Sequence, residues 1–101
     1  MGARSIADTI RDDITAVALD GDTRAAVDQW LAADREFNSW FLGTTKRALG
    51  DDELMALLDG YREAQETVED AWAAFRDEPN TSALRASLAI SLGRIHGLMQ
   101  K

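Results

Sequence analysis

The chain has 101 residues, 46% of them hydrophobic, no cysteine and a formal net charge of −7. This length and hydrophobic content suit one domain with a single modest core. The absence of cysteine excludes disulfide frameworks, thiolate metal sites and thiol enzymes. The acidic balance argues against direct nucleic-acid binding, because phosphates have to be neutralised by clustered Lys and Arg.

We expect neither a signal peptide nor a membrane span in this sequence. Residues 1–8 contain no continuous apolar run, and the apolar stretches elsewhere are far shorter than the roughly 20 residues that cross a bilayer. We therefore expect a cytoplasmic protein without contact to a membrane.

The first predicted helix spans about residues 6–20. The Ser5 hydroxyl can cap its first amides, and Asp8 suits the positive end of the helix dipole. Apolar side chains then recur with a helical period at Ile6, Ile10, Ile14 and Val17. We expect this helix to end near Asp20 and Gly21, because glycine readily adopts the left-handed closing conformation.

The second predicted helix spans about residues 23–42, with Asp22 or Thr23 as its N-cap and Gly43 as its stop. Its apolar side chains, placed at about 100° per residue, cover more than half of the helix circumference. They are Ala26, Val27, Trp30, Leu31, Ala33, Phe37, Trp40 and Phe41. Such a wide arc predicts a helix that is either central in a bundle or covered on its second side by a partner.

The third predicted helix spans about residues 52–76 and has the clearest apolar pattern in the chain. A seven-residue repeat, with further apolar residues beside it, predicts one face directed into a core. The repeat is Leu54, Tyr61, Val68 and Phe75, and the adjacent positions are Leu57, Leu58, Ala64, Ala71 and Trp72. Gly60 interrupts the helix at a cost of about 1 kcal/mol relative to alanine.

The fourth predicted helix spans about residues 81–99, after a break at Pro79. Because the break is short, the last two helices should form an antiparallel hairpin. Residues 51–78 hold ten acids, whereas residues 79–101 hold three basic residues and no acid, so the two halves of the hairpin have complementary charge. No segment alternates between apolar and polar residues for long. We therefore predict an all-α, four-helix antiparallel bundle with a C-terminal helical hairpin.

The carboxylates of the third helix raise the question of a divalent metal site. In the heptad frame of that helix, Asp59, Glu63, Glu66, Glu69 and Asp70 all lie on the outer side, which is typical of a solvated face. A nucleotide pyrophosphohydrolase would need a second acidic pair in the last helix, and a di-iron bundle would need two Glu-x-x-His motifs. The last helix has no acid and the chain has one histidine. We expect no metal site and no cofactor.

Acid–base chemistry has one candidate pair, His96 and Asp34. Asp34 projects into the apolar arc of the second helix, so its carboxylate should be either paired or at the edge of the core. Two side chains that never meet are the simpler reading. The chain also lacks a nucleophile elbow and a glycine-rich phosphate loop. We therefore predict no catalytic residues and no enzyme, with a metal-dependent nucleotide pyrophosphohydrolase-like enzyme as the weakest alternative.

An interaction surface is predicted at the end of the second helix. Trp40 and Phe41 are adjacent and project about 100° apart, so a small bundle has difficulty burying both. Basic residues follow a few positions later, and aromatic residues with arginine are frequent in binding hot spots. The candidate interface is Trp30, Phe37, Trp40, Phe41, Lys46 and Arg47. Packing of the aromatic residues in the core is the alternative.

These features favour a small acidic regulatory protein that docks on another protein. Phage-encoded inhibitors of host or defence proteins belong to this class, and the comparison is a class-level analogy. A homodimer through the wide arc of the second helix is a related expectation. The alternative is a structural or assembly protein, chaperone-like or virion-associated, whose copies pack through the same surface.

Overall fold

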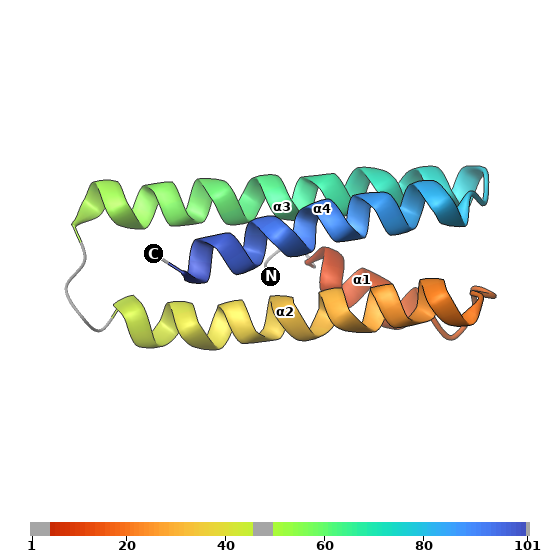
Figure 1. Ribbon diagram of the computed structural model, residues 1–101, viewed down its shortest axis with the longest axis horizontal. Helices are drawn as coiled ribbons and strands as arrows, with labels where there is room; N and C mark the ends of the chain where they lie inside the picture. Colours follow the sequence, from red (N-terminus) through yellow and green to blue (C-terminus); the bar gives the residue numbers. More distant parts are fainter. Residues whose placement is uncertain (1–4, 46–49, 101) are drawn as a thin grey trace.

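The computed structural model describes residues 5–45 and 50–100, without the side chains of residues 44 and 45. Within these residues it contains four helices: α1 (Ile6–Asp13), α2 (Gly21–Thr45), α3 (Asp51–Asp77) and α4 (Thr81–Met99). The molecule is elongated, with dimensions of 44 × 30 × 18 Å. Each of the three long helices runs antiparallel to the one before it in the chain (Figure 1). The predicted all-α bundle with a C-terminal hairpin is confirmed.

The core lies where α4, drawn between the other two long helices in Figure 1, packs against both α3 and α2. Helix α1 contacts α3. All four helices contribute fully buried apolar side chains, because each presents an apolar stripe with a helical period. The largest are Ile10, Val27, Trp30, Phe37, Val68, Trp72, Leu84, Leu88 and Ile95. No helix in the described ranges is long and apolar enough to span a membrane.

The first helix is shorter than predicted, because it ends at Asp13 and not near residue 20. Its predicted start is confirmed, since the Asp8 amide donates to the Ser5 hydroxyl at 3.2 Å. After Asp13 the chain turns, with the Ala16 amide bonded to the Asp13 carbonyl at 2.9 Å. Three of the four residues 14–17 are β-branched, which weakens the helix after Asp13.

The second helix begins earlier and ends later than predicted. Asp20, and not Asp22 or Thr23, lies at its start: Thr23 donates to the Asp20 carboxylate from its hydroxyl at 2.5 Å and its amide at 3.4 Å. The hydrogen bond from the Thr23 side chain lowers the pKa of Asp20. Gly21, predicted to close the first helix, is the first residue of α2. The helix also passes Gly43, which does not adopt a left-handed conformation, and continues to Thr45.

The helices of the hairpin match their predicted ranges within one residue. Asn80 caps α4 by accepting from the Ala83 amide at 3.1 Å. Gly60 lies where α4 approaches α3 closely, because a Cβ atom at this position would be 2.7 Å from Cδ2 of Leu98. Leu58 was predicted in the core, but its side chain is 40% exposed, because it lies at the edge of the apolar face of α3.

Apolar packing, and not charge, joins the two helices of the hairpin. Arg85 of α4 pairs with Asp22 of α2 at 3.7 Å, and Arg94 donates to the Thr67 hydroxyl at 3.4 Å. Within the described part of the chain no ion pair connects α3 to α4. The charge complementarity seen in the sequence therefore does not appear as direct contacts between these helices.

Candidate functional site

The aromatic residues of α2 gather around Phe37. The ring of Tyr61, from α3, stacks on Phe37 with centroids 4.4 Å apart and an angle of 9°. The rings of Trp40 and Phe41 also contact the Phe37 ring, at centroid distances of 5.6 and 5.8 Å. Four of the seven aromatic residues therefore form one connected cluster between α2 and α3, whereas Trp72 and Phe75 stack on each other apart from it.

Two of the predicted interface residues, Trp30 and Phe37, lie inside the protein. Both are fully buried, because this side of α2 packs against α4 and, at Phe37, against Tyr61 of α3. The Trp30 indole donates to the Ser91 hydroxyl of α4 at 2.8 Å, and this hydroxyl donates to the Ala64 carbonyl of α3 at 2.7 Å. These contacts tie α2 to the hairpin and leave Trp30 and Phe37 inaccessible to a partner in this structure.

The accessible part of the predicted interface is the end of α2. Trp40 and Phe41 are half-buried and pack against the core with one side. The next side chain, Leu42, is 65% exposed. We call these three residues the apolar corner. The predicted interface residues Lys46 and Arg47 lie outside the described residues.

Beside the aromatic cluster, a polar cluster surrounds the buried carboxylate of Asp34, which is 4% exposed. The Tyr61 hydroxyl donates to this carboxylate. The Asn38 amide donates to the Asp34 carbonyl at 2.8 Å, and Gln65 donates to the Tyr61 oxygen at 2.8 Å. Every buried polar side-chain atom in the described residues has a partner. Asp34 is therefore hydrogen-bonded, as a buried polar group requires.

The partner of Asp34 is Tyr61 and not His96, whose side chain is exposed. The sequence marked Asp34 as a polar residue in an apolar arc, but Tyr61 looked like an ordinary core position of the heptad repeat. Burial and the hydrogen bond to Asp34 raise the pKa of Tyr61. The Tyr61 hydroxyl connects α3 to α2 through its hydrogen bond to Asp34. Because its pKa is raised, this phenol is poorly suited to transfer a proton at neutral pH.

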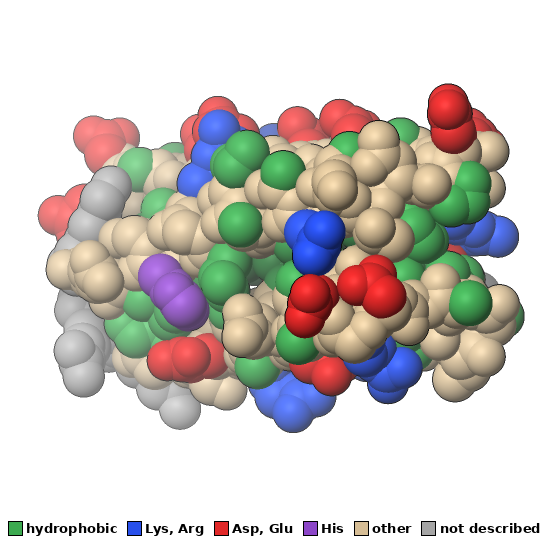
Figure 2. Space-filling view, turned by 45° about the vertical axis from the view of Figure 1, so that its right-hand side comes forward, with side chains coloured by type: hydrophobic (Ala, Val, Ile, Leu, Met, Phe, Trp, Pro, Cys, Tyr) green, Lys and Arg blue, Asp and Glu red, His purple; other side chains and the backbone are tan. Residues whose placement is uncertain are grey.

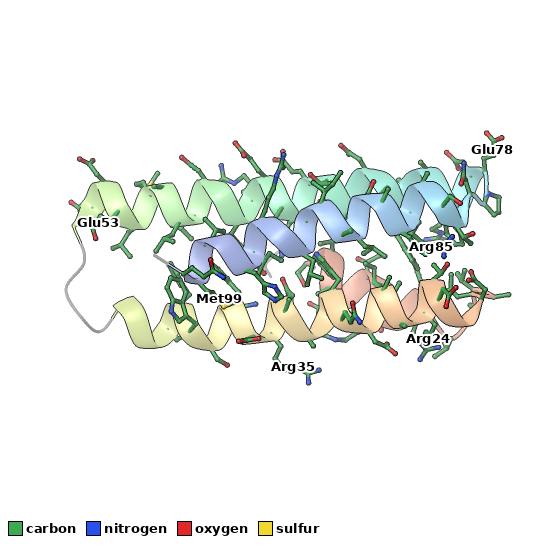
Figure 3. The ribbon with its side chains drawn as sticks, viewed as in Figure 1. Arg24, Arg35, Glu53, Glu78, Arg85 and Met99 are labelled. Carbon is green, nitrogen blue, oxygen red and sulfur yellow. The ribbon has the colours of Figure 1, made fainter. Side chains whose placement is uncertain are left out.

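The carboxylates of α3 point outward, as the heptad frame predicted. Figure 2 shows acidic side chains along the upper edge of the molecule, where α3 lies, and Figure 3 shows side chains of this helix projecting away from the bundle. The five residues considered for a metal site are all exposed: Asp59, Glu63, Glu66, Glu69 and Asp70. The described residues contain no group of three or more metal-ligating side chains.

Similarity to other proteins adds no function to this geometry. Comparison of the chain with protein-family models, curated proteins and solved structures found no match.

Proposed function

We propose that this protein is a small acidic binding protein that regulates another protein by docking on it. The observation that supports this function is the apolar corner. Leu42 is 65% exposed, and the two aromatic side chains beside it are only half-buried against the core. Aromatic residues are enriched in interfaces, where they provide most of the binding free energy.

Charge suits this corner to a particular kind of partner. The chain has a net charge of −7, and the exposed face of α3 is acidic, so a basic partner surface would be attracted over a distance. Lys46 and Arg47, which belong to the predicted interface, follow the corner in the sequence. On this proposal the protein acts in the cytoplasm as an inhibitor of the phage-encoded type, covering a functional surface of a host or defence protein. This class assignment is by analogy.

The proposal is tested by capture of partners from a cell lysate with mass-spectrometric identification. Leu42→Glu places a charge on the exposed side of the corner, and Ile90→Glu is the matched control, because Ile90 is a 53% exposed apolar residue of α4. We expect the unmodified protein and Ile90→Glu to retain the same partner and Leu42→Glu to lose it. Far-UV circular dichroism should be unchanged in both variants.

Two results would contradict the proposed function. One is a protein that retains no partner under any condition. The other is a Leu42→Glu variant that binds as well as the unmodified protein. A loss of helicity in Leu42→Glu would show instead that Leu42 supports the fold. Because Leu42 is 65% exposed, we expect the helicity to be unchanged.

A further inference from the structure

A second exposed feature lies on the outer side of α3. Asp51, Met55, Leu58 and Arg62 are spaced by four, three and four residues, which places them within about 60° of one helix face. We call these residues the α3 stripe. All four are exposed, with Met55 at 55% and Leu58 at 40%, and these two are half of the large exposed hydrophobic residues in the described chain.

The stripe lies on the first half of α3, about 120° or more around the helix from the residues that contact α4. The α4 helix contacts α3 at Gly60, Ala64 and Thr67. Helix α1 packs on the same side of α3 as the stripe, but in the second half of the helix, at Trp72 and Arg76. Helix α2 contacts Tyr61, beside the stripe at the edge of the apolar face. Figure 1 shows α3 forming the upper edge of the bundle, so the outer side of its first half has no neighbouring helix among the described elements. Spacing of this kind is the seam pattern by which two helices pack together.

The order of residues in the stripe is self-complementary. An acid stands at one end and a base at the other, each four residues from an apolar side chain of the central pair. If a second α3 lies antiparallel with the twofold axis between Met55 and Leu58, then Met55 meets Leu58 of the other copy. In the same register Asp51 meets Arg62 of the other copy. All contacts are made twice, as an isologous interface requires.

Neither charged end of the stripe is used inside the chain. Arg11, Arg24, Arg76 and Arg85 each pair with an aspartate of their own chain. Among the described residues, Arg62 and Asp51 take part in no ion pair and no side-chain hydrogen bond. Their charges are therefore available for a second copy, and this charge complementarity selects that copy over an unrelated helix.

We propose that the protein self-associates into an antiparallel dimer through the α3 stripe, with Asp51–Arg62 pairs at both ends of a Met55–Leu58 contact. This inference is independent of the proposed docking function, because the apolar corner lies on α2. The contact is small, at the low end of specific interfaces, so we expect a dissociation constant of roughly 10 µM to 1 mM. The ion pairs are at the rim and should weaken as salt rises.

Sedimentation equilibrium over a concentration series measures this association. The unmodified protein should change from monomer towards dimer as its concentration rises through the expected range, and less so at high salt. Leu58→Glu should remain a monomer because two buried carboxylates would face apolar side chains, whereas the control Ile90→Glu should dimerise normally. Circular dichroism confirms that each variant is folded.

Charge exchange tests the register of the two copies. Asp51→Arg alone and Arg62→Asp alone should each lose the dimer, because like charges then meet at both ends. An equimolar mixture of these two variants should recover it, since every arginine of one copy faces an aspartate of the other. A variant that had merely failed to fold would not be rescued by mixing.

Three results would overturn the self-association. The unmodified protein could stay monomeric at 1 mM, about the weakest affinity expected for the contact. Leu58→Glu could dimerise like the unmodified protein, or the mixture could fail to associate. The protein could also stay monomeric and capture a lysate protein that Leu58→Glu no longer binds. This result would show that the stripe binds a different partner, and it would contradict the proposal. Failure of the Leu42→Glu test, in contrast, affects only the docking function.

Discussion

At the scale of single residues, a few buried polar contacts select one arrangement of an otherwise apolar core. The Trp30 indole reaches α4 at Ser91, and Ser91 reaches α3 at the Ala64 carbonyl. Asp34 and Tyr61 make the corresponding connection between α2 and α3. Apolar packing alone tolerates sliding and rotation of helices, whereas a buried donor without its acceptor carries a free-energy penalty. These contacts therefore define how the helices face one another.

Removal of the Ser91 hydroxyl tests this role. Ser91→Ala leaves the Trp30 indole N–H buried without a partner, so we expect the free energy of unfolding to fall by about 1–3 kcal/mol. The control is Ser39→Ala, an exposed helix position at which the change should be close to zero. Urea denaturation followed by tryptophan fluorescence compares the two variants. Equal midpoints would show that the indole finds another acceptor.

Tyr61 predicts a dependence of stability on alkaline pH. Its pKa is raised by burial and by the bond to Asp34, so the folded chain holds the phenol proton above the ordinary pKa of about 10, where the unfolded chain releases it. The stabilisation is complete below pH of about 10 and is lost as pH rises further. Tyr61 is the only tyrosine, so phenolate absorbance reports on this residue alone.

Two measurements check the Tyr61 prediction. Phenolate absorbance should appear at higher pH in the native protein than in urea, and Tyr61→Phe should remove part of the alkaline loss of stability. Titration of native and denatured protein at the same pH would contradict the prediction.

At the scale of elements, α1 depends on its docking to α3. A helix of 8 residues is not stable alone in water. Its end is held by Asp13, which accepts from the Trp72 indole at 2.8 Å and from Arg76 at 3.1 Å. Its apolar side, Ile6 and Ile10, is buried in the common core. The stability of helix α1 therefore depends on tertiary contacts more than that of the longer helices.

Substitution of Asp13 should open α1 locally. Asp13→Ala leaves the Trp72 indole without its acceptor, and we expect α1 amides to exchange hydrogen about 5–30-fold faster. The protection of α2, α3 and α4 should change little. Asp70→Ala, an exposed position of α3, is the control and should leave exchange unchanged. Equal loss of protection in all four helices would show that α1 unfolds only together with the bundle.

At the scale of the whole molecule, like charges repel across the surface. The chain has a net charge of −7, and Asp59, Glu63, Glu66 and Asp70 recur at helical spacing along exposed α3. Carboxylates three or four residues apart on a helix destabilise it modestly. No ion pair between α3 and α4 in the described residues offsets this repulsion. The burial of the apolar core therefore has to offset it.

Salt should therefore stabilise the monomer. At about 0.15 M ionic strength the Debye length is about 8 Å, so raising NaCl to this level should screen the carboxylates and raise the melting temperature. The double substitution Glu63→Gln and Glu66→Gln should reduce this rise. Dilute protein is used, so that self-association does not contribute. A melting temperature that falls with salt would show that the ion pairs of Asp13 and Asp22 outweigh the repulsion.

Local interactions determined the features that the sequence alone predicted. Apolar residues at helical spacing, a glycine or proline between them and a capping side chain act within a few residues, so the four helices and the hairpin followed from them. The Ser5 cap illustrates this. The outward direction of the α3 carboxylates follows equally from the seven-residue repeat.

Contacts between distant segments decided the rest. The end of α1 at Asp13 coincides with its bonds to Trp72 and Arg76, far along the chain. Trp30 is interior because α4 places Ser91 against it, and Asp34 is paired because α3 places Tyr61 there. A helical period specifies which residues share a face, but only the packed helices determine which part of that face is covered. That is why Leu58 is exposed and Phe37 is buried.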